Sequence, residues 1–200
     1  MEGVKSMLNN INKEPIFPMR QIGEDNWVEN LSSFLEDHDV EMMFVEDETL
    51  FEKAERNLDW IIPSQTKDYF LHFGGIESSD FMYNLKKIDG WEVLTNSVWE
   101  FVSLNFQQEV TDGYIVFAES PGNDPLCFKK DTEEIYLFSH DPIRKAKVYK
   151  DFNDYVINEI IDIQELYEEV TFDSAAEEIA YKANVLDGES IDFDFRYLKL

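Results

Sequence analysis

The chain has 200 residues, of which 43 are Asp or Glu and 17 are Lys or Arg, so its formal net charge is −26 at pH 7. A surface this acidic repels phosphate backbones and anionic lipid headgroups, which argues against nucleic acid and membrane surfaces as partners. The hydrophobic share of 44% and the aromatic share of 14% still supply a folded core. We therefore expect a globular protein whose natural partner is basic.

The cysteine content and the apolar runs exclude further classes. Cys127 is the only cysteine in the sequence, so an internal disulfide and a cysteine-rich zinc site are both excluded. Residues 1–17 lack the continuous apolar stretch of a signal peptide. The longest apolar runs, such as residues 114–118, fall far short of the roughly 20 residues that span a bilayer. We expect a cytoplasmic protein without a cofactor.

The acidic charge is concentrated in two flanks. Residues 24–59 hold 13 acidic and 2 basic side chains, and residues 161–200 hold 11 acidic and 3 basic ones. Between the flanks lies a basic group of six residues: Lys129, Lys130, Arg144, Lys145, Lys147 and Lys150. The acidic flanks are complementary in charge to a basic partner. They are equally typical of solvated faces that keep a protein soluble.

The first part of the chain predicts three helices. Apolar residues recur at spacings of three and four over residues 26–34 and again over residues 48–60, where the apolar face continues to Ile61. A third helix opens at Pro63, which a first helical turn tolerates. Gly74 and the glycine after it end this helix.

The middle of the chain predicts an antiparallel meander. Short strands fit residues 81–85 and 91–94, and a small helix fits residues 98–106. Turn signals then separate β-branched and aromatic runs, which predict strands over residues 114–118, 125–128 and 135–138.

The C-terminal part returns to a helical period. Helices fit residues 152–163 and 174–185, the second with Asp173 as its N-cap. Residues 191–197 alternate strictly between apolar and charged or polar side chains, as a strand does. Helices on both sides of an antiparallel sheet give an α+β fold.

Four segments of this chain resemble the SMI1/KNR4 (SUKH) superfamily, and they occur in the order found in that family. They are IPSQTKDYFLHFGG at residues 62–75, FAESPGNDPLC at 117–127, IYLFSHD at 135–141 and FNDYV at 152–156. The chain departs from the family where its glycine-rich turn becomes Pro-Gly-Asn-Asp-Pro at residues 121–125. The resemblance implies an N-terminal extension (1–43), an SMI1/KNR4-like domain (44–165) and an acidic C-terminal helix-strand extension (166–200).

The resemblance also implies a function. It implies an α+β domain, an antiparallel meander sheet flanked by helices, with no catalytic activity of its own. Most bacterial members look like immunity proteins that bind and neutralise a polymorphic toxin, often a nuclease or a deaminase, whereas fungal members act as regulatory scaffolds. We expect the first role, with a scaffold and an acidic DNA mimic as alternatives. An immunity protein predicts a toxin gene immediately upstream, and a mimic predicts competition by free duplex DNA.

No residue pattern predicts catalysis or metal binding. Cys127 and His140 could form a nucleophile–base pair, but Cys127 stands in an apolar strand, where an inert buried thiol is far commoner. His140 followed by Asp141 could serve a metal or acid–base site, yet a turn after a strand explains the pair more simply. His38 stands in an acidic stretch, and we expect it to be exposed. We therefore expect neither enzyme activity nor a metal.

The expected partner-binding residues come from charge and aromatic content. Interface energy concentrates on aromatic residues, so Trp91 and Trp99 are candidate anchors, although core packing is the commoner role for at least one of them. Acidic candidates precede the second helix and stand in the C-terminal strand; they are Glu46, Asp47, Glu48, Asp192 and Asp194.

Overall fold

A computed structural model describes residues 17–40, 48–74 and 83–185. The predicted strand over residues 191–197, with Asp192 and Asp194, lies outside the described residues, and so do Glu46 and Asp47. The backbone of residues 183–185 is described without their side chains.

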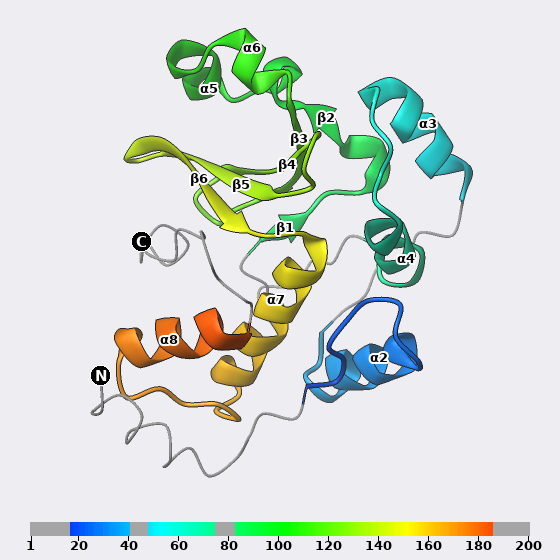
Figure 1. Cartoon of the computed structure of the whole chain (residues 1–200), viewed down its shortest axis with the longest axis vertical. Helices are drawn as coiled ribbons and strands as arrows, with labels where there is room; N and C mark the ends of the chain where they lie inside the picture. The colour runs from blue at the N-terminus through cyan, green and yellow to red at the C-terminus, as the bar shows by residue number, and fades with distance from the viewer. Residues whose placement is uncertain (1–16, 41–47, 75–82, 186–200) are drawn as a thin grey trace.

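The centre of the molecule is a six-stranded antiparallel sheet (Figure 1). Its strands are β1 (Asn84–Leu85), β2 (Glu92–Val93), β3 (Tyr114–Glu119), β4 (Pro125–Lys129), β5 (Ile135–His140) and β6 (Ile143–Tyr149). The order is β1-β3-β4-β5-β6, with β2 also paired to β3. The predicted α+β class and its antiparallel meander are confirmed.

Strand β6 was not predicted from the sequence. Its residues include Arg144, Lys145 and Lys147 in place of the apolar alternation that marks a half-buried strand. The strand forms because the β5–β6 hairpin pairs it with β5, which places Lys145 beside Phe138 and Lys147 beside Tyr136. Long lysine stems can cover such aromatic rings while the amine stays polar, so a basic segment can still complete a sheet.

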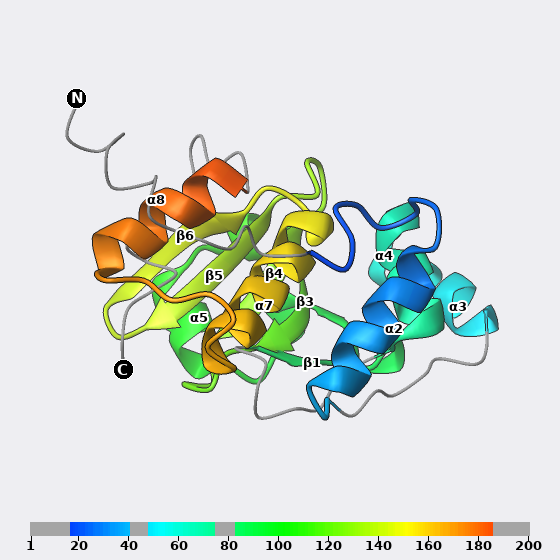
Figure 2. The ribbon, with the colours of Figure 1, turned by 90° about the horizontal axis from the view of Figure 1, so that it is seen from below.

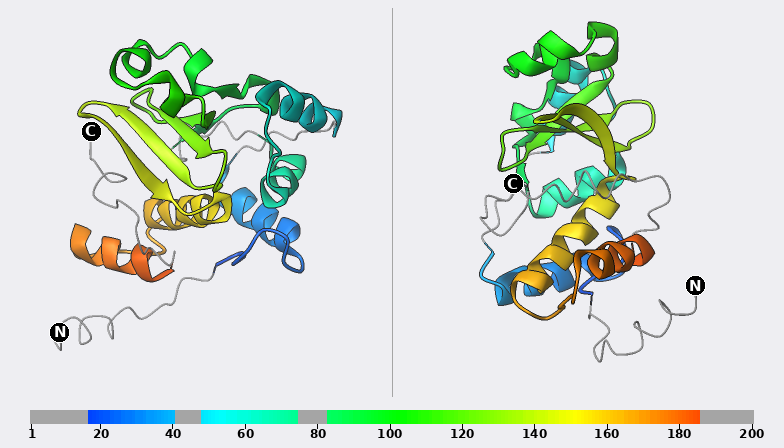
Figure 3. Two further views of the ribbon diagram at one scale, coloured as in Figure 1. Left: turned by 45° about the horizontal axis from the view of Figure 1, so that its top comes forward. Right: turned by 90° about the vertical axis from the view of Figure 1, so that its left-hand side faces the viewer.

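Seven α-helices surround this sheet in the described part of the chain. They are α2 (Trp27–Asp37), α3 (Thr49–Leu58), α4 (Ser64–His72), α5 (Glu100–Asn105), α6 (Gln108–Thr111), α7 (Phe152–Leu166) and α8 (Ala175–Val185). Helix α7 crosses one face of the sheet (Figure 2). Helices α2 and α4 lie near one end of the sheet, and α8 lies alongside α7. Helices α5 and α6 lie on the other side of the sheet (Figure 3). Helix α6 was not predicted; the other helices were.

The cap of α8 differs from the predicted one. The hydroxyl of Ser174 accepts a hydrogen bond from the Glu177 backbone N–H at 3.2 Å, and the Glu177 carboxylate accepts one from the Asp173 N–H at 2.9 Å. The Ser174 hydroxyl thus bonds to the third helical residue, as an N-cap side chain does, while Glu177 reaches back to the residue before the cap. Ser174 is therefore the N-cap, and the prediction of Asp173 was wrong by one residue.

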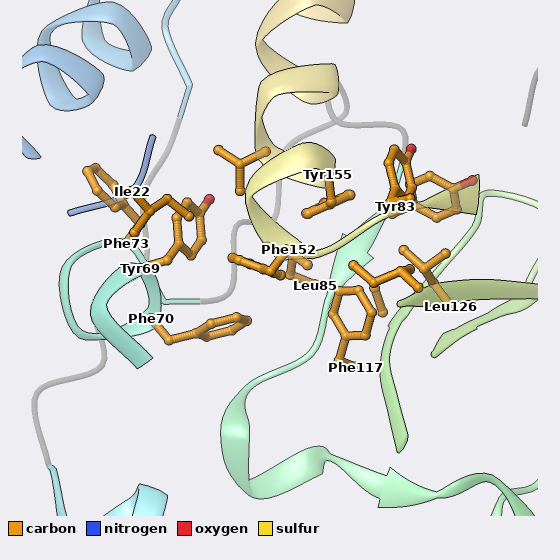
Figure 4. Close-up of a cluster of buried hydrophobic side chains, with 14 of the residues drawn as sticks. Ile22, Tyr69, Phe70, Phe73, Tyr83, Leu85, Phe117, Leu126, Phe152 and Tyr155 are labelled. Carbon is orange, nitrogen blue, oxygen red and sulfur yellow. The ribbon is translucent and has the colours of Figure 1, made fainter. Parts of the chain in front are cut away.

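The main core lies between the sheet, α7 and α4 (Figure 4). Tyr69 and Phe70 of α4 meet Phe152 of α7 at ring-centroid distances of 5.1 and 5.7 Å. Phe117 of β3 stacks on Phe128 of β4 at 4.2 Å. Most of these rings belong to the segments that carry the family resemblance, so those segments act by building the core.

A smaller core fills the opposite face of the sheet. Val116, Cys127 and Phe138 project from β3, β4 and β5 and pack with Trp99 and Val102. Successive side chains of β3 point to opposite faces of the sheet. Val116 therefore faces the smaller core, whereas Ile115 and Phe117 face the main core.

His38 corrects an expectation, because only 5% of its surface is exposed. Its Nδ1 lies 2.6 Å from the Phe34 carbonyl oxygen, and its Nε2 lies 3.4 Å from a Glu169 carboxylate oxygen. The hydroxyl of Tyr167 donates to the His38 carbonyl oxygen at 2.7 Å. The expectation of an exposed His38 was wrong because residues some 130 positions later in the chain cover it, and no local pattern reports such a contact.

Candidate functional site

Both tryptophans that were candidate anchors are packed inside the protein. Trp91 and Trp99 are each 6% exposed. The indole N–H of Trp91 donates to the Lys86 carbonyl oxygen at 3.0 Å, and that of Trp99 to the Asn123 carbonyl oxygen at 2.7 Å. The structure thus gives both rings a packing role. Of the acidic candidates, only Glu48 is described; it is exposed at the start of α3.

The structure separates Cys127 and His140. Cys127 is fully buried, and this burial raises the pKa of its thiol well above the ordinary value. Cys127 stands opposite Tyr136 in the β4–β5 register, so His140 lies four residues farther along β5. Four residues of a strand span about 13 Å. The two side chains therefore do not form a nucleophile–base pair.

His140 has a structural partner instead. Its Nδ1 lies 2.6 Å from Asp124 Oδ1, and its backbone N–H donates to the same oxygen at 3.0 Å. The hydrogen bond and the charge of Asp124 raise the pKa of His140. This contact joins the β3–β4 turn to the end of β5. Among residues 17–40, 48–74 and 83–185, no group of three or more His, Cys, Asp or Glu side chains could hold a metal ion.

Several cations of the basic group contact other residues of the protein. The Glu134 carboxylate pairs with Lys147 at 3.0 Å and with Lys129 at 3.8 Å. The ammonium of Lys145 donates to the Tyr114 hydroxyl at 3.1 Å and lies 5.0 Å from the centre of that ring. These contacts join β6 to β3 and to the turn between β4 and β5.

A shallow, wide-open depression of about 730 Å³ lies between α3 and the turn that joins β4 to β5. We call it the α3 hollow; its lining residues are Glu52, Glu55, Arg56, Asp59, Trp60, Ile61, Lys130 and Glu133. The lining carries four carboxylates and two cations, a net charge of −2. It therefore combines an acidic rim with aromatic and aliphatic side chains.

Long-range hydrogen bonds hold the floor of the α3 hollow. The indole N–H of Trp60 donates to the Lys130 carbonyl oxygen at 3.1 Å. In return, the Lys130 ammonium donates to the Leu58 carbonyl oxygen at 2.8 Å, at the end of α3. The Trp60 ring also packs against Phe128 in a tilted arrangement, with the centroids 5.3 Å apart. These contacts tie the end of α3 to the turn between β4 and β5.

Ile61 stands at the α3 hollow with 79% of its surface exposed. The spacing of the apolar residues predicted that Ile61 continues the buried face of this helix, and that prediction was wrong. Helix α3 ends at Leu58, because Asp59 adopts a left-handed backbone with φ of 48°. The break turns Ile62 inward, where it is 1% exposed, and leaves Ile61 outside.

Most of the acidic rim makes no ion pair with the residues that the structure describes. Glu55 is engaged, since its carboxylate pairs with Lys67 at 2.6 Å and accepts the Ile62 N–H at 2.9 Å. Glu52, Asp59 and Glu133 are exposed. In the three described ranges, none of these three carboxylates takes part in an ion pair. The rim therefore presents exposed negative charge beside the apolar side chain of Ile61.

A comparison with protein families matches residues 46–158 to the SMI1 / KNR4 family (SUKH-1). This range covers more than half of the chain. The chain belongs to the SMI1/KNR4 family. The predicted resemblance is confirmed, and the matched range contains the main core strands, α4 and all residues of the α3 hollow. Comparisons with curated proteins and with solved structures gave no match.

The matched range ends within α7 and begins after α2. Even so, Trp27, Leu31 and Leu35 of α2 belong to the same buried cluster as the family strands. None of the helices in the described ranges is long and apolar enough to cross a membrane.

Proposed function

We propose that this SMI1/KNR4 protein is a non-enzymatic immunity protein that binds and neutralises a basic toxin domain. The α3 hollow carries the proposal, because it gathers free carboxylates around an exposed apolar residue within the family-matched part of the chain. Family membership supports the immunity role, which is common among SUKH proteins.

The overall charge supports a basic partner. Nuclease active sites are positive because they hold phosphates, and a protein of net charge −26 is attracted to such a surface. Electrostatic steering of this kind raises association rates by about 10–10³ at low salt. The inhibitor then needs no catalytic residue, since covering the toxin is enough.

The first test is co-expression with the toxin encoded immediately upstream. We expect this chain to restore growth and to co-purify with the toxin. If cells that express the upstream protein grow normally without this chain, that protein is not a toxin and the regulatory scaffold is favoured. The absence of any toxin gene upstream would favour the scaffold too. Release of the partner by free duplex DNA would instead favour a DNA mimic.

The second test is stopped-flow association with the toxin across a salt series. The Debye length falls from about 30 Å at 0.01 M to about 8 Å at 0.15 M, so association should slow steeply while dissociation changes less. Neutralising Glu46, Asp47 and Glu48 together should reproduce part of the effect. An association rate that stays flat with salt would contradict electrostatic steering.

A further inference from the structure

We propose that His38 is the centre of a pH-sensitive clamp, which holds the end of α2 against the segment after α7 when both nitrogens of its ring carry a proton. The clamp consists of His38, Tyr167 and Glu169, and we call these three residues the His38 clamp. Both sides of the clamp lie outside residues 46–158. It therefore belongs to the parts of the chain that the family match does not cover.

The surroundings of the His38 ring fit the doubly protonated form. Nδ1 lies 2.6 Å from the Phe34 carbonyl oxygen, and a carbonyl oxygen only accepts hydrogen bonds, so Nδ1 carries a proton. Nε2 lies 3.4 Å from a carboxylate oxygen of Glu169, and an ionised carboxylate also only accepts. In a neutral ring with its proton on Nδ1, the lone pair of Nε2 would face that carboxylate. Both nitrogens are matched to their partners only in the imidazolium ion.

The position of His38 also suits a cation. His38 is the C-cap of α2, and a positive charge at the C-terminal end of a helix is attracted to its last carbonyl groups. The charged or titratable groups of the two segments are Glu36, Asp37 and Asp39 around His38 in the sequence, and Tyr167, Glu168 and Glu169 across from it. Within residues 17–40, 48–74 and 83–185, Glu169 is the one charged group that forms an ion pair with His38.

Loss of the Nε2 proton weakens the clamp without opening it. The carboxylate of Glu169 is 47% exposed, so it can turn towards solvent once the ion pair is lost. The other contacts do not depend on the charge of the ring. The Tyr167 hydroxyl still donates to the His38 carbonyl oxygen at 2.7 Å, and the two rings still pack with their centroids 4.7 Å apart. The clamp is therefore tightest at low pH and looser at high pH.

The first measurement is the protonation state of the His38 ring in the full chain. A ¹H–¹⁵N NMR correlation of the imidazole nitrogens shows which of them carries a proton. The chain has three histidines, so His72→Gln and His140→Gln assign the signals of His38 by elimination. We expect two protonated nitrogens at about pH 5.5 and one, Nδ1, at about pH 8.5, on either side of the range in which histidine usually titrates.

The second measurement is hydrogen-exchange protection on both sides of the clamp at the same two pH values. The reporters are the Val40 amide, which donates to the Leu35 carbonyl oxygen at 2.9 Å, and the Glu169 amide, which donates to that of Gln164 at 2.8 Å. An ion pair with a half-exposed carboxylate contributes modestly. We therefore expect protection factors about two- to fivefold higher at the lower pH.

Two matched variants separate the ion pair from the general effect of charge. Glu169→Gln removes the carboxylate, and its amide can pair with either form of the ring, so the pH difference in protection should disappear. Glu168→Gln makes the same charge change at the exposed neighbour and should keep the difference. His72 and His140 titrate in the same range in all three proteins, so the comparison cancels their effect.

Each outcome decides for or against the clamp. A His38 ring with a single proton at the lower pH would overturn it, and so would protection of the two reporter amides that does not change with pH. Equal loss of the pH difference in both variants would overturn the role of the Glu169 pair. Loss confined to Glu169→Gln supports the clamp, whether or not this chain neutralises a toxin.

Discussion

The two acidic flanks look alike in the sequence but are built differently. In the C-terminal flank, Lys182 is completely buried and its ammonium contacts Asp162, Glu178 at 2.9 Å and Glu165 at 3.9 Å. These contacts tie α8 to α7. In the N-terminal flank, Glu52 and Asp59 face solvent at the rim of the α3 hollow without an ion pair among the described residues.

This difference shows that the number of carboxylates does not reveal their role. Carboxylates that surround a buried cation compensate its desolvation and hold two helices together. Exposed carboxylates without a partner contribute little to folding and keep their charge available for a ligand. The C-terminal flank is therefore structural where it meets Lys182, and the α3 hollow is the part suited to binding.

The largest effect is expected from Lys182→Met. The variant leaves Asp162 and Glu178 facing each other without their cation, and removing one partner of a buried ion pair costs about 3–5 kcal/mol. We expect α8 to lose its hydrogen-exchange protection and the urea midpoint to fall. Lys150→Met, which changes an exposed lysine, serves as the control. Unchanged protection of α8 would contradict the structural role of this cluster.

A smaller effect is expected when the same charge change is made in each flank. Asp162→Asn/Glu165→Gln/Glu178→Gln should destabilise the docking of α8, because Lys182 is then buried without a counter-ion. The hollow variant, Glu52→Gln/Asp59→Asn/Glu133→Gln, should change the free energy of unfolding by less than about 0.5 kcal/mol, as surface substitutions usually do. Urea unfolding followed by circular dichroism measures both. Equal destabilisation by the two variants would remove the distinction between the flanks.

Glu134 is a third kind of carboxylate, because it pairs with two lysines of the basic group. Burial raises the pKa of Glu134, but hydrogen bonds from Lys147 and Thr132 outweigh it and hold the pKa below its ordinary value of 4.5. The resulting stability is complete above pH 4.5 and is lost as the pH falls through the lower, folded-state pKa. Glu134→Gln should cost about 1–2 kcal/mol at pH 7.

Urea unfolding of the wild type and Glu134→Gln across pH 3–7 checks this prediction. The gap in stability between them should close towards the acid end. A gap that is constant over the whole range would mean that the charge of Glu134 does not matter.

The smallest effect is expected at His140. Asp124 raises its pKa above 6.5, so its contribution is complete below pH 6.5 and is lost as the pH rises through the higher, folded-state pKa. The side chain is 50% exposed, and solvent limits the contribution to a few tenths of a kcal/mol. Unfolding of wild type and His140→Gln at pH 6 and pH 8 measures it; a wider gap at pH 8 would contradict this sign.

Local patterns were enough to predict the α+β class, the helices other than α6, and the strands that carry the core. These elements alternate at periods set by their own neighbours, as Ile115 and Phe117 do on β3. Strand β6 was missed because its pairing with β5, and not its own composition, makes it a strand.

The site was harder to predict because it depends on contacts between distant segments. Trp60 and Lys130 are 70 residues apart in the chain and exchange hydrogen bonds only after folding. A sequence signal for Ile61 did exist: Asp59 and Pro63 lie on either side of it, and such residues commonly end or start helices. If Asp59 ends one helix and Pro63 starts the next, Ile61 lies in the connection between them and is predicted to be at the surface.

The most direct test of the account measures the affinity of the cognate toxin for the hollow variant and for an α2 control variant. The control variant is Glu29→Gln/Glu36→Gln/Asp37→Asn, which makes the same charge change on exposed residues of α2. Both variants carry the same net charge, so a difference between them reports the α3 hollow alone. The account predicts that the hollow variant binds at least tenfold more weakly and dissociates faster, while the control slows association only slightly. Equal affinities for the two variants would contradict it, because the acidic flanks would then act through their overall charge and the hollow would have no special role.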